Sequence, residues 1–196
     1  MKDLLKLKKR IILASKSPRR KNLMRQLGLN FTVIESGIDE KAHSYEGSPP
    51  DYAKQLALKK ANDVAEKVNE PAIVIGADTI VVINGKILNK PKDSDDARAM
   101  LGTLSGNTHT VYTGVAVIDT ETKKQIVDVK ATNVTFRQLD ESEITAYVET
   151  GSPLDKAGAY GIQDDFGAVF ISHIEGCYYN IVGLPLELLY SMLKRL

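Results

Sequence analysis

The pattern of apolar and polar positions along the chain predicts strands and helices in a mixed order. Apolar runs or alternations of strand length occupy residues 11–13, 31–34, 72–83, 108–119 and 125–136. The third segment starts as AIVIGAD, continues as IVVI and ends at Asn84-Gly85, a pair typical of a tight hairpin turn. A charged turn at 120–124 joins the last two segments, which indicates an antiparallel pair.

Apolar residues recur at helical spacing in residues 17–27, 48–68, 94–104 and 140–150, and we expect a last helix from Pro185. Ser17 before Pro18 has the chemistry of an N-cap followed by a first helical residue. Ser94 is the expected cap of the third helix. Asp140 and Glu143 resemble a capping box at the start of the fourth helix.

The C-terminal third contains a glycine-rich stretch at 151–168, followed by segments that we expect to form a hairpin. These are AVFISHI at 168–174 and YYNIV at 178–182, on either side of a Glu175-Gly176 turn. Strands and helices do not alternate as in a simple βαβ series, so we expect an α/β fold with a mixed sheet and flanking helices. The 196 residues fit one sizeable domain, or two lobes that share a core.

The stretch Ser17-Pro18-Arg19-Arg20 places two arginines in the first turn of a helix. The helix dipole favours acidic residues there, so the two cations oppose the local rule. A broken local rule often marks a functional site, and an anion held by backbone amides and guanidinium groups would explain it. The alternative is a solvated basic turn with no ligand.

Asp78 and Lys60 are unusual for their surroundings. Asp78 ends the run IVIGA, where a carboxylate in an open α/β sheet can serve as general base or metal ligand. The alternative is an aspartate that turns the chain. Lys60 interrupts the apolar stripe of the predicted helix 48–68, so it is either paired, or facing a cleft, or extending its ammonium group to solvent.

Acidic residues follow the second predicted strand. Glu35, Asp39 and Glu40 could hold Mg²⁺, which takes one or two carboxylates together with substrate phosphates. The three histidines lie far apart without ligand spacing, which argues against zinc. Cationic groups, carboxylates and an aspartate base together suit metal-assisted hydrolysis of a phosphoanhydride. These residues do not distinguish a nucleotide pyrophosphatase from a simple phosphatase.

Composition limits the partners and the compartment. No apolar run approaches the roughly 20 residues of a membrane helix. The single cysteine, Cys177, suits a reducing compartment, and we expect a cytoplasmic protein. Residues 1–21 carry a net charge of +8 and the remainder −7. A basic end can bind nucleic acid, a membrane surface or a division partner. No aromatic residues are interleaved with it, so a small polyphosphate explains it with fewer assumptions.

Several short motifs, taken in order, resemble those of the Maf family of nucleoside triphosphate pyrophosphatases. They are SKSPRR at 15–20, GADT at 76–79, NKP at 89–91, LSG at 104–106, DKAGAYGIQ at 155–163 and VGLPL at 182–186. The resemblance covers essentially the whole chain, 1–196. It implies a two-lobed α/β domain related to the inosine triphosphate pyrophosphatases, with a central cleft. It also implies cleavage of a nucleoside triphosphate to monophosphate and pyrophosphate with Mg²⁺ or Mn²⁺, a homodimer, and a candidate role in division arrest.

The resemblance assigns roles to individual positions. By the motifs, Asp78 resembles the proton acceptor, and Glu40 an acidic residue of the metal site or of catalysis. Phosphate-binding groups would be Arg19, Arg20, Lys60 and Lys90. The positions tied to base choice in the branch acting on dTTP and UTP are Arg19, Thr79 and Gln163, and Lys156 would lie in the cleft. Two departures are the residues before Ile11 and a longer loop, Asp164–Phe166, after Gln163.

Overall fold

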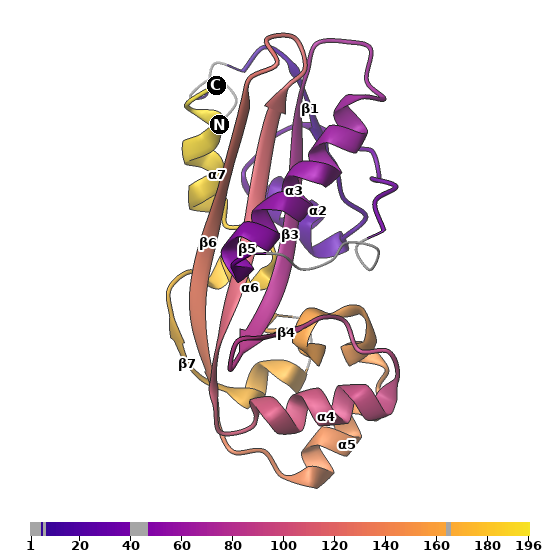
Figure 1. Ribbon diagram of the computed structural model, residues 1–196, viewed down its shortest axis with the longest axis vertical. Helices are drawn as coiled ribbons and strands as arrows, with labels where there is room; N and C mark the ends of the chain where they lie inside the picture. The colour runs from indigo at the N-terminus through magenta and orange to yellow at the C-terminus, as the bar shows by residue number, and fades with distance from the viewer. Residues whose placement is uncertain (1–4, 6, 40–46, 164–165) are drawn as a thin grey trace. The chain divides into compact units, whose positions relative to one another are not determined.

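The computed structural model describes residues 5, 7–39, 47–163 and 166–196 (Figure 1). The strands are β1 (Arg10–Leu13), β2 (Phe31–Val33), β3 (Ala72–Ile83), β4 (Lys86–Leu88), β5 (Thr108–Asp119), β6 (Gln125–Phe136) and β7 (Ile171–Glu175). The helices are α2 (Pro18–Gln26), α3 (Pro49–Ala65), α4 (Ser94–Leu104), α5 (Glu141–Glu149), α6 (Tyr178–Val182) and α7 (Leu186–Leu193). Short 3₁₀ helices are η2 (Ser152–Asp155), η3 (Ala157–Ala159) and η4 (Phe166–Phe170).

The strands form a seven-stranded mixed sheet in the order β2-β1-β3-β5-β6-β7, with β4 paired to β3. β1 is parallel to both β2 and β3, whereas β4 is antiparallel to β3 and β7 is antiparallel to β6. The expected α/β class with a mixed sheet and an antiparallel part is therefore confirmed. Among the described residues, no helix combines the length and the apolar character needed to cross a membrane.

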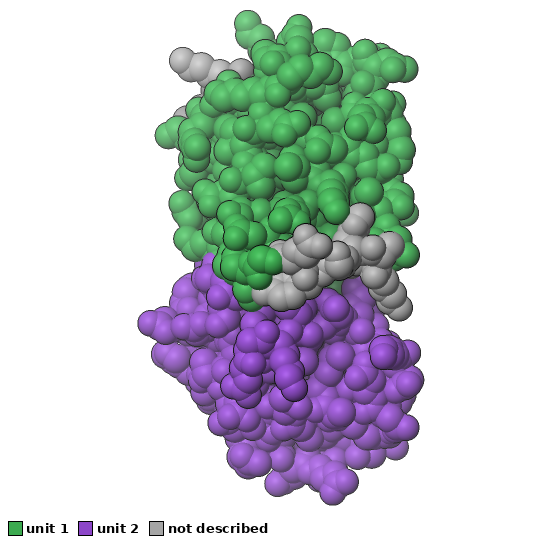
Figure 2. All heavy atoms as spheres, in the orientation of Figure 1, with its two compact units in different colours: residues 1–78, 113–130, 183–196 green, residues 79–112, 131–182 purple. Residues whose placement is uncertain are grey.

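The chain divides into two compact units, coloured separately in Figure 2. Unit 1 comprises residues 1–78, 113–130 and 183–196, and unit 2 comprises residues 79–112 and 131–182. The strands β3, β5 and β6 each contribute residues to both units, and the division within β3 falls between Asp78 and Thr79.

The core of unit 1 forms where α3 packs on the sheet. Buried alanine and valine residues of α3 meet apolar side chains of β1, β3 and β5. Gly76 makes this close approach possible, because a Cβ atom there would collide with the backbone of Ala57 and Ala61. Gly114 on β5 has the same relation to Ala53. Small residues on both sides therefore set how near α3 lies to the sheet.

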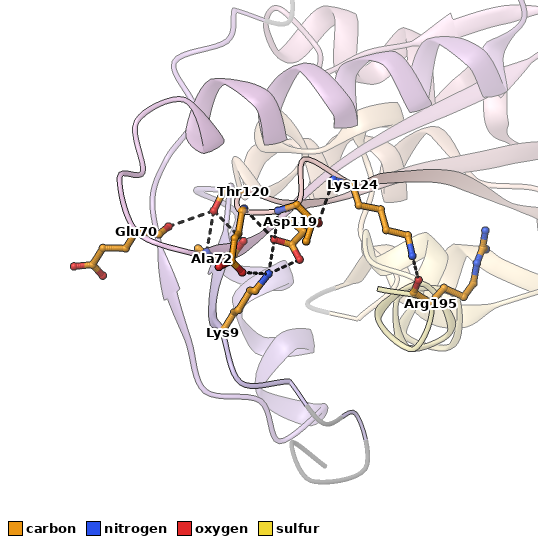
Figure 3. A network of polar contacts seen from close by, with 9 residues as sticks. Lys9, Glu70, Ala72, Asp119, Thr120, Lys124 and Arg195 are labelled. Carbon is orange, nitrogen blue, oxygen red and sulfur yellow. Dashed lines mark hydrogen bonds and ion pairs between the residues drawn. The ribbon is translucent and has the colours of Figure 1, made fainter.

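A network of polar contacts lies in unit 1 at the turn between β5 and β6 (Figure 3). Lys9 donates to both carboxylate oxygens of Asp119, at 2.8 and 2.7 Å, and also pairs with Glu121. Burial raises the pKa of Asp119, but hydrogen bonds from Lys9 and from the amides of Thr122 and Glu121 outweigh it, so the pKa lies below its usual value. The network ties the segment before β1 to the far end of β5.

The core of unit 2 is rich in aromatic rings. Phe136 contacts Tyr160 edge-on at 4.9 Å between ring centroids, and Phe170 packs edge-on against Tyr147 at 5.2 Å. The helices α4 and α5 pack against one another and against η3 and η2 respectively (Figure 1). Arg137 forms a two-pronged ion pair with Glu143 and lowers the pKa of that carboxyl to about 2.

Several local expectations need correction. Residues 178–182 form the helix α6 rather than the second strand of a hairpin, and residues 166–170 form η4 rather than the start of β7. The cap of α4 is Asp93, whose carboxylate accepts from the amide of Asp96, so Ser94 is already helical. The helix α3 ends at Ala65 instead of reaching residue 68. The Asn84-Gly85 turn and the Asp140 capping box are confirmed, and both turn residues have positive φ.

Candidate functional site

The two arginines of the SKSPRR motif lie in the first turn of α2, as expected. Ser17 caps the helix by accepting from the amide of Arg20, and no acidic residue stands in that turn. The motif begins directly after β1, where the amide of Ala14 donates to the carbonyl of Ile75 on β3 at 2.8 Å. Arg19 and Arg20 therefore start from the edge of the sheet at which the parallel pairing of β1 with β3 ends.

Arg20 also joins two motifs that are far apart in the sequence. Its Nε donates to the carbonyl of Gly183 at 2.7 Å, which ties SKSPRR to VGLPL within unit 1. This bond fixes one edge of the guanidinium plane. Both arginines are half-buried, so the side chains that start α2 are held against the protein rather than extended into solvent.

Asp78 lies inside β3 rather than at its end, which corrects the expected position. The strand is continuous over Ala72–Ile83. Its parallel pairing with β1 stops at Ile75, and its antiparallel pairing with β4 begins at Val81. Asp78 thus stands between the two pairings. β1, the parallel neighbour of β3, ends near this point and leads into α2. Ligands of open α/β sheets bind outside the carboxyl ends of such strands.

Lys60 forms a buried ion pair with Asp78. Its Nζ lies 2.5 Å from Oδ1 of Asp78, and the two side chains are 7% and 6% exposed. Gly76 brings α3 close enough for this contact, since Lys60 lies between the two alanines that face that glycine. Lys60 is therefore paired. Opposite charges that are both out of water compensate one another, and removing either one would leave the other exposed to a large desolvation cost.

The predicted metal ligands are described only in part. Glu40 lies outside the described residues, whereas Asp39 is described and exposed. Within the described ranges, no group of three or more histidine, cysteine, aspartate or glutamate residues could hold a metal ion. Of the two predicted ligands, the structure therefore describes Asp78, a buried carboxylate, and Mg²⁺ can take one carboxylate together with phosphates and water.

In unit 2, the β3–β4 hairpin brings two candidate residues towards one another. Val81 pairs with Leu88. Thr79 lies on β3 two residues before this pair, and Lys90 lies two residues after it. Both are therefore on the side of the pair that is away from the Asn84-Gly85 turn. Thr79 is half-buried and Lys90 is exposed. The NKP motif therefore directly follows β4, the hairpin partner of β3.

The DKAGAYGIQ motif packs against this hairpin. The amide of Gly158 donates to the carbonyl of Asn89 at 3.2 Å, which joins the motif to NKP. Gly158 has φ +70°, and a Cβ atom there would lie 3.0 Å from Val81. Both the backbone conformation and the space at this position thus favour glycine.

Lys156 is buried, and its own segment holds its ammonium group. Nζ donates to the carbonyl and the hydroxyl of Ser152, at 2.6 and 2.8 Å, and lies 2.9 Å from Asp155. These contacts organise η2 as well as placing the cation. Gln163, the predicted base-contacting residue, is half-buried at the end of the motif. Of the expected longer loop, Asp164–Phe166, residues 164 and 165 lie outside the described residues.

The LSG motif has a structural explanation. The hydroxyl of Ser105 accepts from the amide of Leu139 at 2.8 Å, and the amide of Gly106 donates to the carbonyl of Arg137 at 3.0 Å. Gly106 has φ +67°, and a Cβ atom there would collide with the side chain of Gln138. This motif therefore joins the end of α4 to the segment that leads into α5.

Sequence reasoning overlooked His109, which is 2% exposed on β5. Its Nε2 and the hydroxyl of Tyr160 lie 2.7 Å apart, so a histidine outside the predicted site contacts the DKAGAYGIQ motif. A signal was present in the pattern THTVYT, because His109 occupies the same alternation as Val111 and Thr113, both buried. The spacing between histidines indicates metal sites, but it does not indicate a hydrogen bond between a histidine and a distant tyrosine.

Comparison with known proteins agrees with this arrangement of motifs. A family model described as Maf-like protein matches residues 10–196. A protein of Alkaliphilus oremlandii named dTTP/UTP pyrophosphatase is 55% identical over 178 residues, covering 91% of this chain and 91% of the relative. A protein of the same name from Thermoanaerobacter sp. (strain X514) is 50% identical, covering 95% of this chain and 96% of its own length.

Solved structures match at lower identity. The Ham1 protein of Staphylococcus aureus is 17% identical, with a TM-score of 0.49 and coverage of 95% of this chain and 99% of that chain. A HAM1 protein from Coxiella burnetii has the same TM-score of 0.49 at 14% identity, with coverage of 95% of this chain and 99% of that chain. The assignment to a family rests instead on the match over residues 10–196 and on relatives that share half of their residues with this chain. The chain belongs to the Maf family.

Proposed function

We propose that this protein is a nucleoside triphosphate pyrophosphatase that hydrolyses dTTP and UTP to the nucleoside monophosphate and pyrophosphate. The buried pair of Lys60 and Asp78, beside the edge where SKSPRR begins, is the observation that carries the proposal. Relatives named dTTP/UTP pyrophosphatase support the choice of substrates. The expected single domain with two lobes around a cleft remains a prediction.

In the proposed mechanism, Asp78 accepts a proton from the water that attacks the α-phosphorus. Lys60 holds the Asp78 carboxylate in place. The guanidinium and ammonium groups of Arg19, Arg20 and Lys90 bind the phosphates and stabilise charge that develops on the leaving pyrophosphate. Mg²⁺ or Mn²⁺, held by Asp78 and Glu40 when bound, would neutralise further charge on the phosphates.

Base choice is assigned to Gln163, with Thr79 and Arg19 shaping the pocket and Lys156 as a further substrate-binding residue of the segment that carries Gln163. An amide offers one donor and one acceptor, which match O4 and N3–H of uracil or thymine. A site built for these groups leaves polar atoms unpaired when a purine enters, at about 1–3 kcal/mol for each buried group. We therefore expect Gln163→Ala to lower kcat/KM for dTTP and UTP while the fold stays intact. Unchanged preference in this variant would refute the assignment.

A nucleotide panel with Mg²⁺ tests the proposal as a whole. We expect pyrophosphate from dTTP and UTP, well ahead of ATP and GTP. Asp78→Asn should lower the rate on the order of 10²–10⁴-fold, because a positioned base contributes about that much. Asp119→Asn is the matched control, since Asp119 is also buried in unit 1 but belongs to the network at the β5–β6 turn. Near-normal turnover by Asp78→Asn would remove Asp78 from the mechanism.

The same panel separates the alternatives. Orthophosphate as the product would indicate a phosphatase. No hydrolysis, together with salt-dependent DNA binding that is lost on deleting residues 1–8, would indicate a regulatory binding protein. The homodimer is tested by the mass of the protein in solution, and the cytoplasmic location, supported by the single cysteine, by cell fractionation.

A further inference from the structure

We propose that His109 is a positioning residue: through Tyr160 it holds the segment 155–163 in the shape that presents Lys156 and Gln163 to the nucleotide. This inference rests on the proposed function for its nucleotide part. The proposed mechanism does not use His109, which is remote in sequence from every motif except LSG at 104–106.

The contact is short, buried and enclosed by rings. The 2.7 Å hydrogen bond between Nε2 of His109 and the Tyr160 hydroxyl lies beside Phe136, which packs edge-on against both rings. His109 and Tyr160 are 2% and 5% exposed. Burial lowers the pKa of His109 to about 4, so the imidazole is neutral at pH 7 and can form this bond without placing a charge in the core.

Within the described residues, Nδ1 of His109 is buried and has no hydrogen-bond partner. A histidine at this position therefore leaves one ring nitrogen unsatisfied, a cost that an apolar residue would not carry. Packing alone would be served better by phenylalanine or leucine. The bond to Tyr160 is the feature that histidine adds.

The segment next to Tyr160 has a strained backbone. Gly158 and Ala159 have φ values of +70° and +62°, both in the left-handed region. Ala159 carries a Cβ atom and is fully buried, so this conformation persists only where the surroundings enforce it. The bond from Gly158 to Asn89 holds one side of the turn, and the bond from Tyr160 to His109 holds the other.

This turn lies between the two residues that the nucleotide is expected to meet. Lys156 precedes Gly158 by two residues, and Gln163 follows Tyr160 by three. If Tyr160 loses its hydrogen bond to His109, the backbone at Ala159 can adopt a less strained conformation. The path of the chain from Tyr160 to Gln163 is then no longer fixed. We therefore expect substrate binding to suffer more than the chemical step, for which Asp78 is responsible.

Three variants test the bond. His109→Phe and Tyr160→Phe keep the rings and remove the bond, and His109→Gln keeps an amide group that can reach the hydroxyl. We expect His109→Phe and Tyr160→Phe each to raise KM for dTTP and UTP about tenfold, with kcat within about threefold, the size expected for one hydrogen bond. His109→Gln should recover most of the KM. The double variant should be no worse than either single one, because both remove the same bond.

Phe170→Leu is the matched control, because Phe170 belongs to the same aromatic cluster but its side chain does not bond the segment. It should lower Tm and leave KM unchanged. A His109→Phe variant that behaves likewise, with lower Tm and normal KM, would show a role in packing only and overturn the inference.

Amide hydrogen exchange at residues 158–161 gives a readout that needs no substrate. His109→Phe should speed exchange there and leave β5 protected. Wild-type exchange rates in this variant would also overturn the inference. If the wild-type protein hydrolyses neither dTTP nor UTP, the proposed function fails and the nucleotide part of the inference fails with it, while exchange still decides whether His109 holds the segment.

Discussion

Two buried polar pairs, Lys60–Asp78 in unit 1 and His109–Tyr160 in unit 2, join segments of the fold by different kinds of bond. Each joins a strand to another segment, one partner of each pair lies in a motif, and each pair has a donor and an acceptor out of water. The first pair is charged and lies next to the small residues of α3 and Gly76. The second is neutral and is enclosed by aromatic rings.

The difference follows from what each pair has to do. A buried ion pair contributes little net stability, because desolvation of both charges offsets their attraction. A charged pair in the core of unit 1 is therefore better explained by chemistry that needs a carboxylate. The neutral pair avoids this desolvation cost, so it can stabilise the strained turn at Gly158 and Ala159. Substitutions at each pair and a change of pH test this contrast between a charged and a neutral pair.

The largest effect is expected from Lys60→Met, which leaves Asp78 without its cation. Breaking a buried ion pair on one side costs about 3–5 kcal/mol of unfolding free energy. Urea denaturation should show this loss for Lys60→Met. Gln55→Met, at an exposed position of α3, should change the free energy by about 0.5 kcal/mol or less. Similar values for the two variants would mean that the pair is not electrostatically coupled.

A second effect concerns pH and the neutral pair. The pKa of His109 is lowered from 6.5 to about 4, so the unfolded chain binds the extra proton first as pH falls. The stability from neutral His109 is present above pH 6.5 and decreases towards pH 4. Between pH 7 and pH 5 the loss is about 2 kcal/mol. His109→Phe should show a flatter stability profile in this window, and an unchanged profile would contradict the burial of a neutral imidazole.

Gly158→Ala tests the turn that the neutral pair holds. A left-handed residue with a Cβ atom costs about 1–2 kcal/mol, and the contact with Val81 adds to this cost. Gly85→Ala is the matched control, because Gly85 has a similar φ of +74° and nothing within 4 Å of a Cβ atom. Thermal unfolding should therefore show a larger loss for Gly158→Ala. Equal losses would mean that the turn has room to move.

The smallest effect is expected at the surface. Lys9 pairs with Asp119 and Glu121, and its pKa is raised by its hydrogen bonds to Asp119 and then Glu121. Because water screens this partly exposed ammonium group, Lys9→Ala should lower Tm less than any variant above. Lys8→Ala, an exposed neighbour, should leave Tm unchanged. A loss at Lys9 as large as that at Lys60 would show that burial does not set the cost of breaking an ion pair.

Local patterns predicted most of the strands and most helix starts because short-range chemistry decides them. The apolar run of β3, the Asn84-Gly85 turn and the capping box at Asp140 were all predicted from neighbours in the sequence. The same approach failed for residues 178–182, where apolar and aromatic residues suit a strand as well as a short helix. There, the choice depends on what the segment packs against.

The sequence by itself determined the α/β class, the order of the motifs and the unusual character of Arg19, Arg20, Lys60 and Asp78, since each of these can be recognised from residue type and spacing. Only the tertiary structure decided that Lys60 pairs with Asp78, that Arg20 is tied to Gly183, and that His109 contacts Tyr160. These partners are 18, 163 and 51 residues apart in the chain. No local pattern encodes such contacts, because they form only when strand order and helix packing bring distant segments together.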